Sequence, residues 1–179
     1  MTDWPLGFTC GTCGQSHAGM PFSFAADFPD MYANMTEENR ELRAVVGSDQ
    51  CILDSQWFFI RGLLEIPIIG SDEPFLWGLW ASVREGVFDE ITDCWELPGR
   101  EKHHGPFKGR LANMLPVYTD TLNLKLNIIL QPLGTRPLFV VEDEKHEMEE
   151  LQRSGFTLEQ ATELASFLLH IEGNKWAHS

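Results

Sequence analysis

The chain has 179 residues, of which 43% are hydrophobic and 22% charged, a balance typical of a folded globular protein. Its 27 acidic residues outnumber its 13 basic ones, so the formal net charge is −14. Nucleic acids and anionic membranes are bound mainly through Lys and Arg, and this charge therefore argues against both as partners. A basic protein surface or a cationic ligand suits such a chain better.

The first residues show no basic segment followed by an apolar stretch, which a secretory signal would require. The longest apolar stretches are interrupted by Arg61 and Glu65 and fall well short of the ~20 residues of a membrane-spanning helix. We therefore expect a cytoplasmic protein, whose four Cys are thiols or metal ligands. The length fits a single domain over residues 1–179.

The chain begins with a Gly- and Cys-bearing turn at 8–17 and a short helical turn at 29–35. Thr36 is a suitable N-cap for a helix over 37–45. Alternating apolar runs and Gly/Pro/Asp turns then predict further elements. These are strands near 50–54, 57–69 and 75–83, a helix over 84–96, and strands over 122–128 and 136–141.

The C-terminal part is predicted to be helical. Thr157 and Gln160 have the spacing of a capping box. An apolar stripe at helical spacing follows them, formed by Leu158, Ala161, Ala165, Leu168 and Leu169. With a sheet region at 49–142 and a helical region at 144–172, the pattern predicts an α+β fold with a mostly antiparallel central sheet and flanking helices.

The strongest local motif is Cys10-x-x-Cys13, followed by a Gly. Two thiolates at this spacing can hold one tetrahedral zinc ion from a tight turn, and His17 lies close enough to add a nitrogen ligand. Cys51 is the first choice for the fourth ligand. The alternative fourth ligands are Cys94, His103, His104 and His146. A structural zinc is the leading interpretation of this zinc-knuckle-like turn; a redox dithiol and two unliganded thiols are the alternatives.

Arg61 and Glu65 interrupt an otherwise apolar strand. In a regular strand they share one face with Leu63, whereas Leu64 and Ile66 point to the other. Charged groups in such a strand must pair with other groups or face a cleft. Arg61 and Glu65 are therefore candidates for structural charge pairs or for a ligand cleft.

Several short motifs spread along the chain together resemble the bacterial DUF2199 family of domains of unknown function. The motifs are Phe8-x-Cys10-x-x-Cys13-Gly14-x-x-His17, Ser48-Asp49-Gln50-Cys51, Phe59-Ile60-Arg61-Gly62-x-Leu64-Glu65-Ile66-Pro67, Phe75-x-Trp77-Gly78-x-Trp80-x-Ser82, Leu115-Pro116-x-Tyr118-x-x-Thr121-x-x-Leu124-Lys125, Gly134-x-Arg136-Pro137 and Gln152-Arg153-x-Gly155. The resemblance spans nearly the whole chain. It implies a bacterial protein without an assigned activity, and it points to Cys10, Cys13, His17 and Cys51 as site candidates.

No phosphate-binding loop, nucleophile elbow or zinc-protease helix motif is present in the sequence. The leading hypothesis is a non-enzymatic zinc-binding domain that interacts with another protein, for example an immunity or antitoxin-like protein that masks a basic effector. The alternative is a metal-assisted hydrolase with a cleft near Cys51, Arg61 and Glu65. The sequence sets no oligomeric state.

Overall fold

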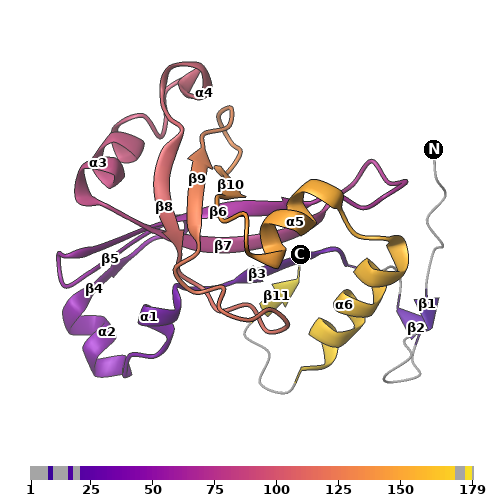
Figure 1. Cartoon of the computed structure of the whole chain (residues 1–179). Helices are drawn as coiled ribbons and strands as arrows, with labels where there is room; N and C mark the ends of the chain where they lie inside the picture. The colour runs from indigo at the N-terminus through magenta and orange to yellow at the C-terminus, as the bar shows by residue number, and fades with distance from the viewer. Residues whose placement is uncertain (1–7, 10–15, 18–20, 172–175, 179) are drawn as a thin grey trace.

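The computed structural model describes residues 8–9, 16–17, 21–171 and 176–178 (Figure 1). Near the N-terminus, β1 (Phe8–Thr9) pairs antiparallel with β2 (Ser16–His17), and this pairing places Phe8 opposite His17. Cys10 and Cys13 lie outside the described residues. The zinc-knuckle-like turn therefore stays a prediction.

Five strands close into a barrel: β6 (Trp57–Ile66), β7 (Phe75–Val83), β8 (Phe107–Leu111), β9 (Lys125–Ile129) and β10 (Leu138–Val141). Each strand runs antiparallel to the next, and β10 closes the barrel by pairing parallel to β6 through Leu138 and Leu63. The α+β class is confirmed. The mostly antiparallel central sheet is wrong, because the sheet is mixed and closed on itself.

The closure depends on the length of β6 and β7, because each pairs along one edge with two different strands in succession. The first part of β6 pairs with β5 (Gln50–Leu53), and Leu63 further along pairs with β10. The first part of β7 pairs parallel to β3 (Ser23–Ala26), and its last part pairs with β8. β4 (Ala44–Val46) and β11 (Trp176–His178) extend this sheet at its two ends.

Six helices are present in the described part of the chain: α1 (Asp30–Ala33), α2 (Glu37–Arg43), α3 (Glu85–Asp93), α4 (Arg100–His103), α5 (Glu147–Ser154) and α6 (Leu158–His170). Two predicted caps are confirmed. The Thr36 side chain accepts a hydrogen bond from the backbone N–H of Asn39, and Thr157 with Gln160 forms a capping box. Each such cap stabilises its helix by about 1 kcal/mol.

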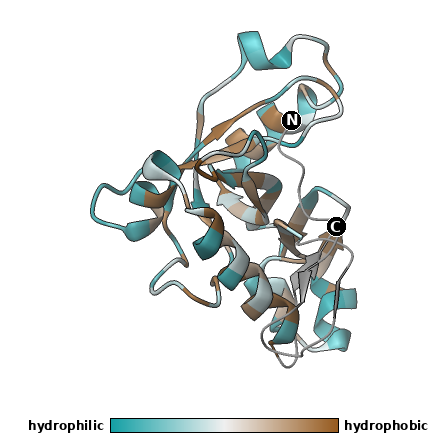
Figure 2. Cartoon of the chain, turned by 90° about the vertical axis from the view of Figure 1, so that its right-hand side faces the viewer, coloured by the Kyte–Doolittle hydropathy of each residue, from teal (hydrophilic) through white to brown (hydrophobic). Residues whose placement is uncertain are grey.

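The core lies between the barrel strands and the helices that cover them, and Figure 2 shows hydrophobic residues gathered on the central strands. As predicted, Ile60, Leu64 and Ile66 share the buried face of β6. Burial of one such side chain stabilises the fold by roughly 2 kcal/mol. Gly62 lies on the same face, where a Cβ atom would collide with the ring of Phe139. The missing side chain therefore lets that ring fill the barrel.

Most predicted elements are a few residues longer than those of the structure, and two differences change which side chains are buried. The strand expected over 122–128 is β9, which starts only at Lys125, because Asn123 has a left-handed backbone with φ of 70°. Leu122 is exposed as a result, whereas Leu126 and Ile128 are buried. In α6, Leu158 is exposed and Leu164 takes its place in the buried stripe. Within the described part of the chain, no helix has both the length and the apolar character needed to cross a membrane.

Candidate functional site

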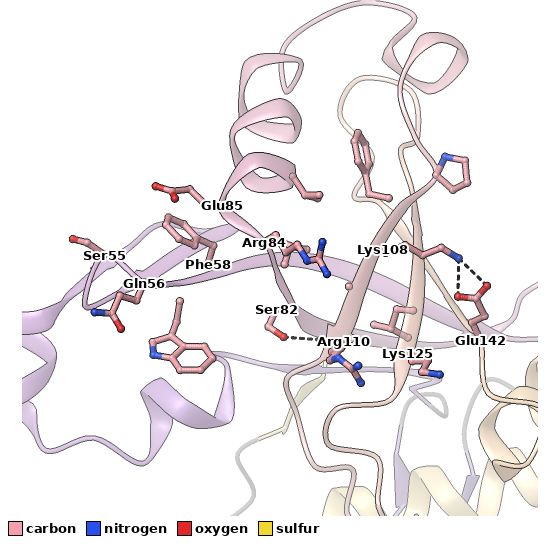
Figure 3. Close-up of a pocket in the computed structure, with 17 residues that line it drawn as sticks. Ser55, Gln56, Phe58, Ser82, Arg84, Glu85, Lys108, Arg110, Lys125 and Glu142 are labelled. Atoms are coloured by element: carbon pink, nitrogen blue, oxygen red, sulfur yellow. Dashed lines mark hydrogen bonds and ion pairs between the residues drawn. The ribbon is translucent and has the colours of Figure 1, made fainter.

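A surface groove opens where β7 and β8 separate. These two strands pair only through Ala81 with Leu111 and Ser82 with Arg110. Beyond this point β7 leads into α3, while β8 continues alongside β9 alone (Figure 1). The groove has a volume of about 1030 Å³. It lies between the start of α3, the first residues of β6, the last residues of β7, and the β8–β9 pair (Figure 3).

Four cationic side chains line this groove: Arg84, Lys108, Arg110 and Lys125. Ser82, Arg110 and Lys125 form a row across β7, β8 and β9, because Ser82 pairs with Arg110 and Arg110 pairs with Lys125. Like charges directly opposite each other on neighbouring strands destabilise a sheet. The Arg110–Lys125 pair thus carries a cost that an anion placed near it would relieve.

The groove contains few anionic groups to balance these cations. Glu85 and Glu142 are its only acidic lining residues among those described. Glu142 is engaged by Lys108, whose ammonium nitrogen lies 2.7 Å from both carboxylate oxygens (Figure 3). The hydrogen bond from Lys108 lowers the pKa of Glu142, and the charge of Lys125 lowers it further. Lys108 is therefore already neutralised.

The other cations have weaker partners. Arg110 donates a hydrogen bond from Nη1 to the backbone oxygen of Asn123 at 3.1 Å. Neither Arg84, Arg110 nor Lys125 forms an ion pair within 4 Å with a described residue. With these cations outnumbering the lining carboxylates, the groove holds an excess of positive charge in a chain of net charge −14.

The remaining walls of the groove are apolar. They include Trp57, whose surface is 48% exposed, together with Phe58, Val87 and Phe107. Phe58 is held in place by the ring of Phe88 on α3, with ring centroids 5.2 Å apart. Phe58 pairs with Val83, so Trp57 and Arg84 are the next residues outward on β6 and after β7. Trp57 and Arg84 therefore leave the paired strands at the same end of the groove.

Arg61, predicted either to pair with other groups or to line a cleft, joins segments of the chain. Its Nη2 donates to the backbone oxygen of Ala26 at 3.1 Å and its Nη1 to that of Ser48 at 3.4 Å. Its guanidinium carbon lies 5.8 Å from the centre of the Trp80 ring. Burial lowers the pKa of Arg61, and so does the nearby charge of Arg136. Arg61 thus holds the end of β3 and the turn before β5 against β6.

Asp49, beside Arg61, forms the ion pair of this region. Arg136 donates from Nε to a carboxylate oxygen of Asp49 at 2.5 Å. Burial by itself raises the pKa of Asp49, but hydrogen bonds from Ser48 and Arg136 outweigh it, so that the pKa lies below its usual value. The pair fixes the loop that precedes β10 to the loop that precedes β5.

Glu65 does not form an ion pair with Arg61, although both lie on the outer face of β6 as predicted. It lines a separate hollow of about 440 Å³ together with Asp72, Phe139 and Gln152. Gln152 of α5 donates to the backbone oxygens of Glu65 and Phe139 and accepts a bond from the backbone N–H of Val141. The side chain of Gln152 thus attaches α5 to the barrel.

The predicted zinc ligands are only partly within the described residues. Cys51 is on β5 and fully buried in the core as a free thiol, where burial raises its pKa to about 12. The described residues contain no group of three or more His, Cys, Asp or Glu arranged to hold a metal ion. His146 is the N-cap of α5 and accepts a hydrogen bond from the N–H of Met148.

The fold and the groove define a small α+β barrel protein with a cationic surface groove. A family model described as an uncharacterized protein conserved in bacteria, DUF2199, matches residues 9–156, and the chain belongs to this family. No curated protein and no solved structure shows a significant match to the chain. The resemblance drawn from the sequence motifs is confirmed.

Sequence reasoning missed the groove because its cations come from three separate segments. One local signal was present: Lys108, Arg110 and Lys125 each lie beside an apolar residue in the sequence. Such alternation is typical of a strand whose charged side chains share one face. The region around Lys108 carries a Gly and two charges in five residues, so it did not suggest a strand.

Proposed function

We propose that this protein is a non-enzymatic binding domain whose groove between α3, β8 and β9 receives an anionic ligand. The observation that carries this proposal is the presence of Arg84, Arg110 and Lys125 in one groove without an ion-pair partner among the described residues. An anion bound there gains charge-assisted hydrogen bonds and relieves the repulsion between Arg110 and Lys125.

The composition of the groove favours binding over catalysis. Its described lining has the hydroxyl groups of Ser55 and Ser82, but no His or Cys that would activate them as a nucleophile or act as a general base. Ser82 is already engaged, since its hydroxyl donates a hydrogen bond to the backbone oxygen of Arg110.

The test is a calorimetric titration of the full chain with inorganic phosphate in low-salt buffer. Arg110→Gln should weaken binding at least tenfold. The matched control is Arg153→Gln, which removes the same charge from α5, where Arg153 is exposed and pairs with Glu150 of the same helix. Equal affinities of the two variants would show that the groove is not the binding site.

The zinc site remains a second proposal, supported by the Cys10-x-x-Cys13 motif and by the pairing of β1 with β2, which brings the two flanks of the motif together. We propose that Cys10, Cys13 and His17 hold a structural zinc. Cys51 is fully buried in the core on β5, which makes it a poor fourth ligand. Elemental analysis of protein purified without added metal should give about one zinc per chain.

The net charge of −14 supports the further proposal that the acidic surface outside the groove meets a basic protein partner, as an immunity-type protein would. Glu85 and Glu142 are the only acidic residues of the described part of the chain that line the groove, so most of the described negative charge lies elsewhere. Association of this kind should weaken steeply as the salt concentration rises from about 50 to about 500 mM, because the Debye length falls from about 14 to about 4 Å over that range.

The alternative of a metal-assisted hydrolase near Cys51, Arg61 and Glu65 receives less support from the geometry. Cys51 is fully buried, Arg61 bonds to backbone carbonyls, and Glu65 lines a hollow whose other lining residues include neither of them. The three residues do not share one cleft.

A further inference from the structure

We propose that the anion bound in the groove is a phosphate monoester that carries a planar apolar group. This inference rests on the proposed function and adds the chemical class of the ligand. Three features support it: the number and type of the groove's cations, the exposed indole that lines the same groove, and the negative charge of the rest of the chain.

The cations favour a phosphate over a carboxylate. Arg84 and Arg110 each present a planar guanidinium that can donate two parallel hydrogen bonds, and Lys125 adds a point charge (Figure 3). A carboxylate has one charge and two oxygens, whereas a phosphate monoester at pH 7 has close to two charges and three terminal oxygens. Three cations without ion-pair partners among the described residues match the phosphate.

The apolar wall next to these cations favours a planar group. Trp57 is 48% exposed, whereas most of the other residues of β6 are buried. Phe58 and Phe107 line the same groove. A flat ring attached to the phosphate would cover the indole and remove apolar surface from water, and aromatic pairs gain further from stacking.

The charge around the groove favours a compact ligand. The groove's volume of about 1030 Å³ leaves ample room for a small molecule, because it lies just above the usual range of about 300–1,000 Å³ for such sites. At physiological salt the Debye length is about 8 Å, so a ligand inside the groove interacts mainly with the groove's own cations. A long polyanion, such as single-stranded nucleic acid or an acidic peptide, would extend over a surface that carries most of the described negative charge.

The experiment compares phenyl phosphate, inorganic phosphate and phenol as ligands of the full chain by calorimetry. We expect phenyl phosphate to bind at least tenfold more tightly than inorganic phosphate, and phenol not to bind measurably. Trp57→Ala should reduce this preference to less than threefold while leaving the affinity for inorganic phosphate unchanged. Trp57→Phe should keep most of the preference, because it retains a ring; unchanged thermal unfolding of both variants verifies that they are folded.

The outcomes separate the two proposals. If inorganic phosphate and phenyl phosphate bind equally and Trp57→Ala changes nothing, the anion site stands and the planar group is wrong. If neither phosphate binds at millimolar concentration, both proposals fail. A ten-residue oligothymidylate or a poly-glutamate peptide that binds more tightly than phenyl phosphate would show that the groove serves a polymer and would overturn this inference.

Discussion

Replacing Arg61 with Met tests whether this residue holds the fold together or lines a ligand cleft. The side chain forms one hydrogen bond of ordinary length, from Nη2 to the backbone oxygen of Ala26, and a longer one to Ser48. A hydrogen bond from a charged donor contributes about 1.5–3 kcal/mol, and contact with the Trp80 ring adds about 1 kcal/mol.

Two effects reduce the expected loss. Met relieves the cost of burying the guanidinium and its repulsion from Arg136. The oxygen of Ala26 also keeps a second donor, the indole N–H of Trp80 at 3.3 Å. We therefore expect Arg61→Met to lower the free energy of unfolding by about 2 kcal/mol.

The assay is urea denaturation of Arg61→Met beside the parent and beside Arg153→Met, an exposed arginine of α5 whose loss should not move the midpoint. An Arg61→Met midpoint equal to that of the parent would refute the structural role. It would make a water-lined ligand site at Arg61 the better account.

Three further predictions concern pH, backbone geometry and metal. Because the pKa of Asp49 is lower in the folded protein, its carboxylate stabilises the fold above the unfolded pKa of about 3.9, and this contribution is lost as the pH falls further. Asp49→Asn should therefore destabilise the protein at neutral pH and flatten the loss of stability below about pH 4 in acid titrations followed by circular dichroism. An unchanged profile would contradict this. Gly155 has φ of 81° and ψ of 173°, and a Cβ atom there would lie 2.8 Å from the backbone oxygen of Pro67. Gly155→Ala should therefore lower the free energy of unfolding by about 2–3 kcal/mol, measured by thermal unfolding. The loss should be smaller for Gly70→Ala, because no atom lies within 4 Å of a Cβ at Gly70. Cys10→Ser should both remove bound zinc and lower the melting temperature. If the zinc content and the melting temperature both stay unchanged, a structural zinc at this turn is rejected.

Local features of the fold could be predicted from the sequence because their causes are local. The caps at Thr36 and Thr157 are hydrogen bonds with residues three positions further along, and the helix α3 follows from a nine-residue amphipathic segment. The alternation that places Arg61 and Glu65 on one face of β6 is likewise a property of the strand itself.

Closure of the barrel and the groove depends on contacts between distant segments. The parallel pairing of Leu138 with Leu63 joins strands far apart in the chain, and no pattern within either strand requires it. The roles of Arg61 and Asp49 were equally hidden, because their partners Ala26, Ser48 and Arg136 come from three loops or strand ends. Only the assembled barrel brings Arg84 of the α3 N-cap near Arg110 and Lys125.

The most direct test of the central claim is to follow the backbone amides of the labelled protein by nuclear magnetic resonance while inorganic phosphate is added. The account predicts that the largest shifts cluster at Arg84, Lys108, Arg110 and Lys125, which line the groove. Saturable shifts confined to these residues and their neighbours would place the anion in the groove. Shifts that are absent, or that gather around Arg61 and Arg136 instead, would contradict it.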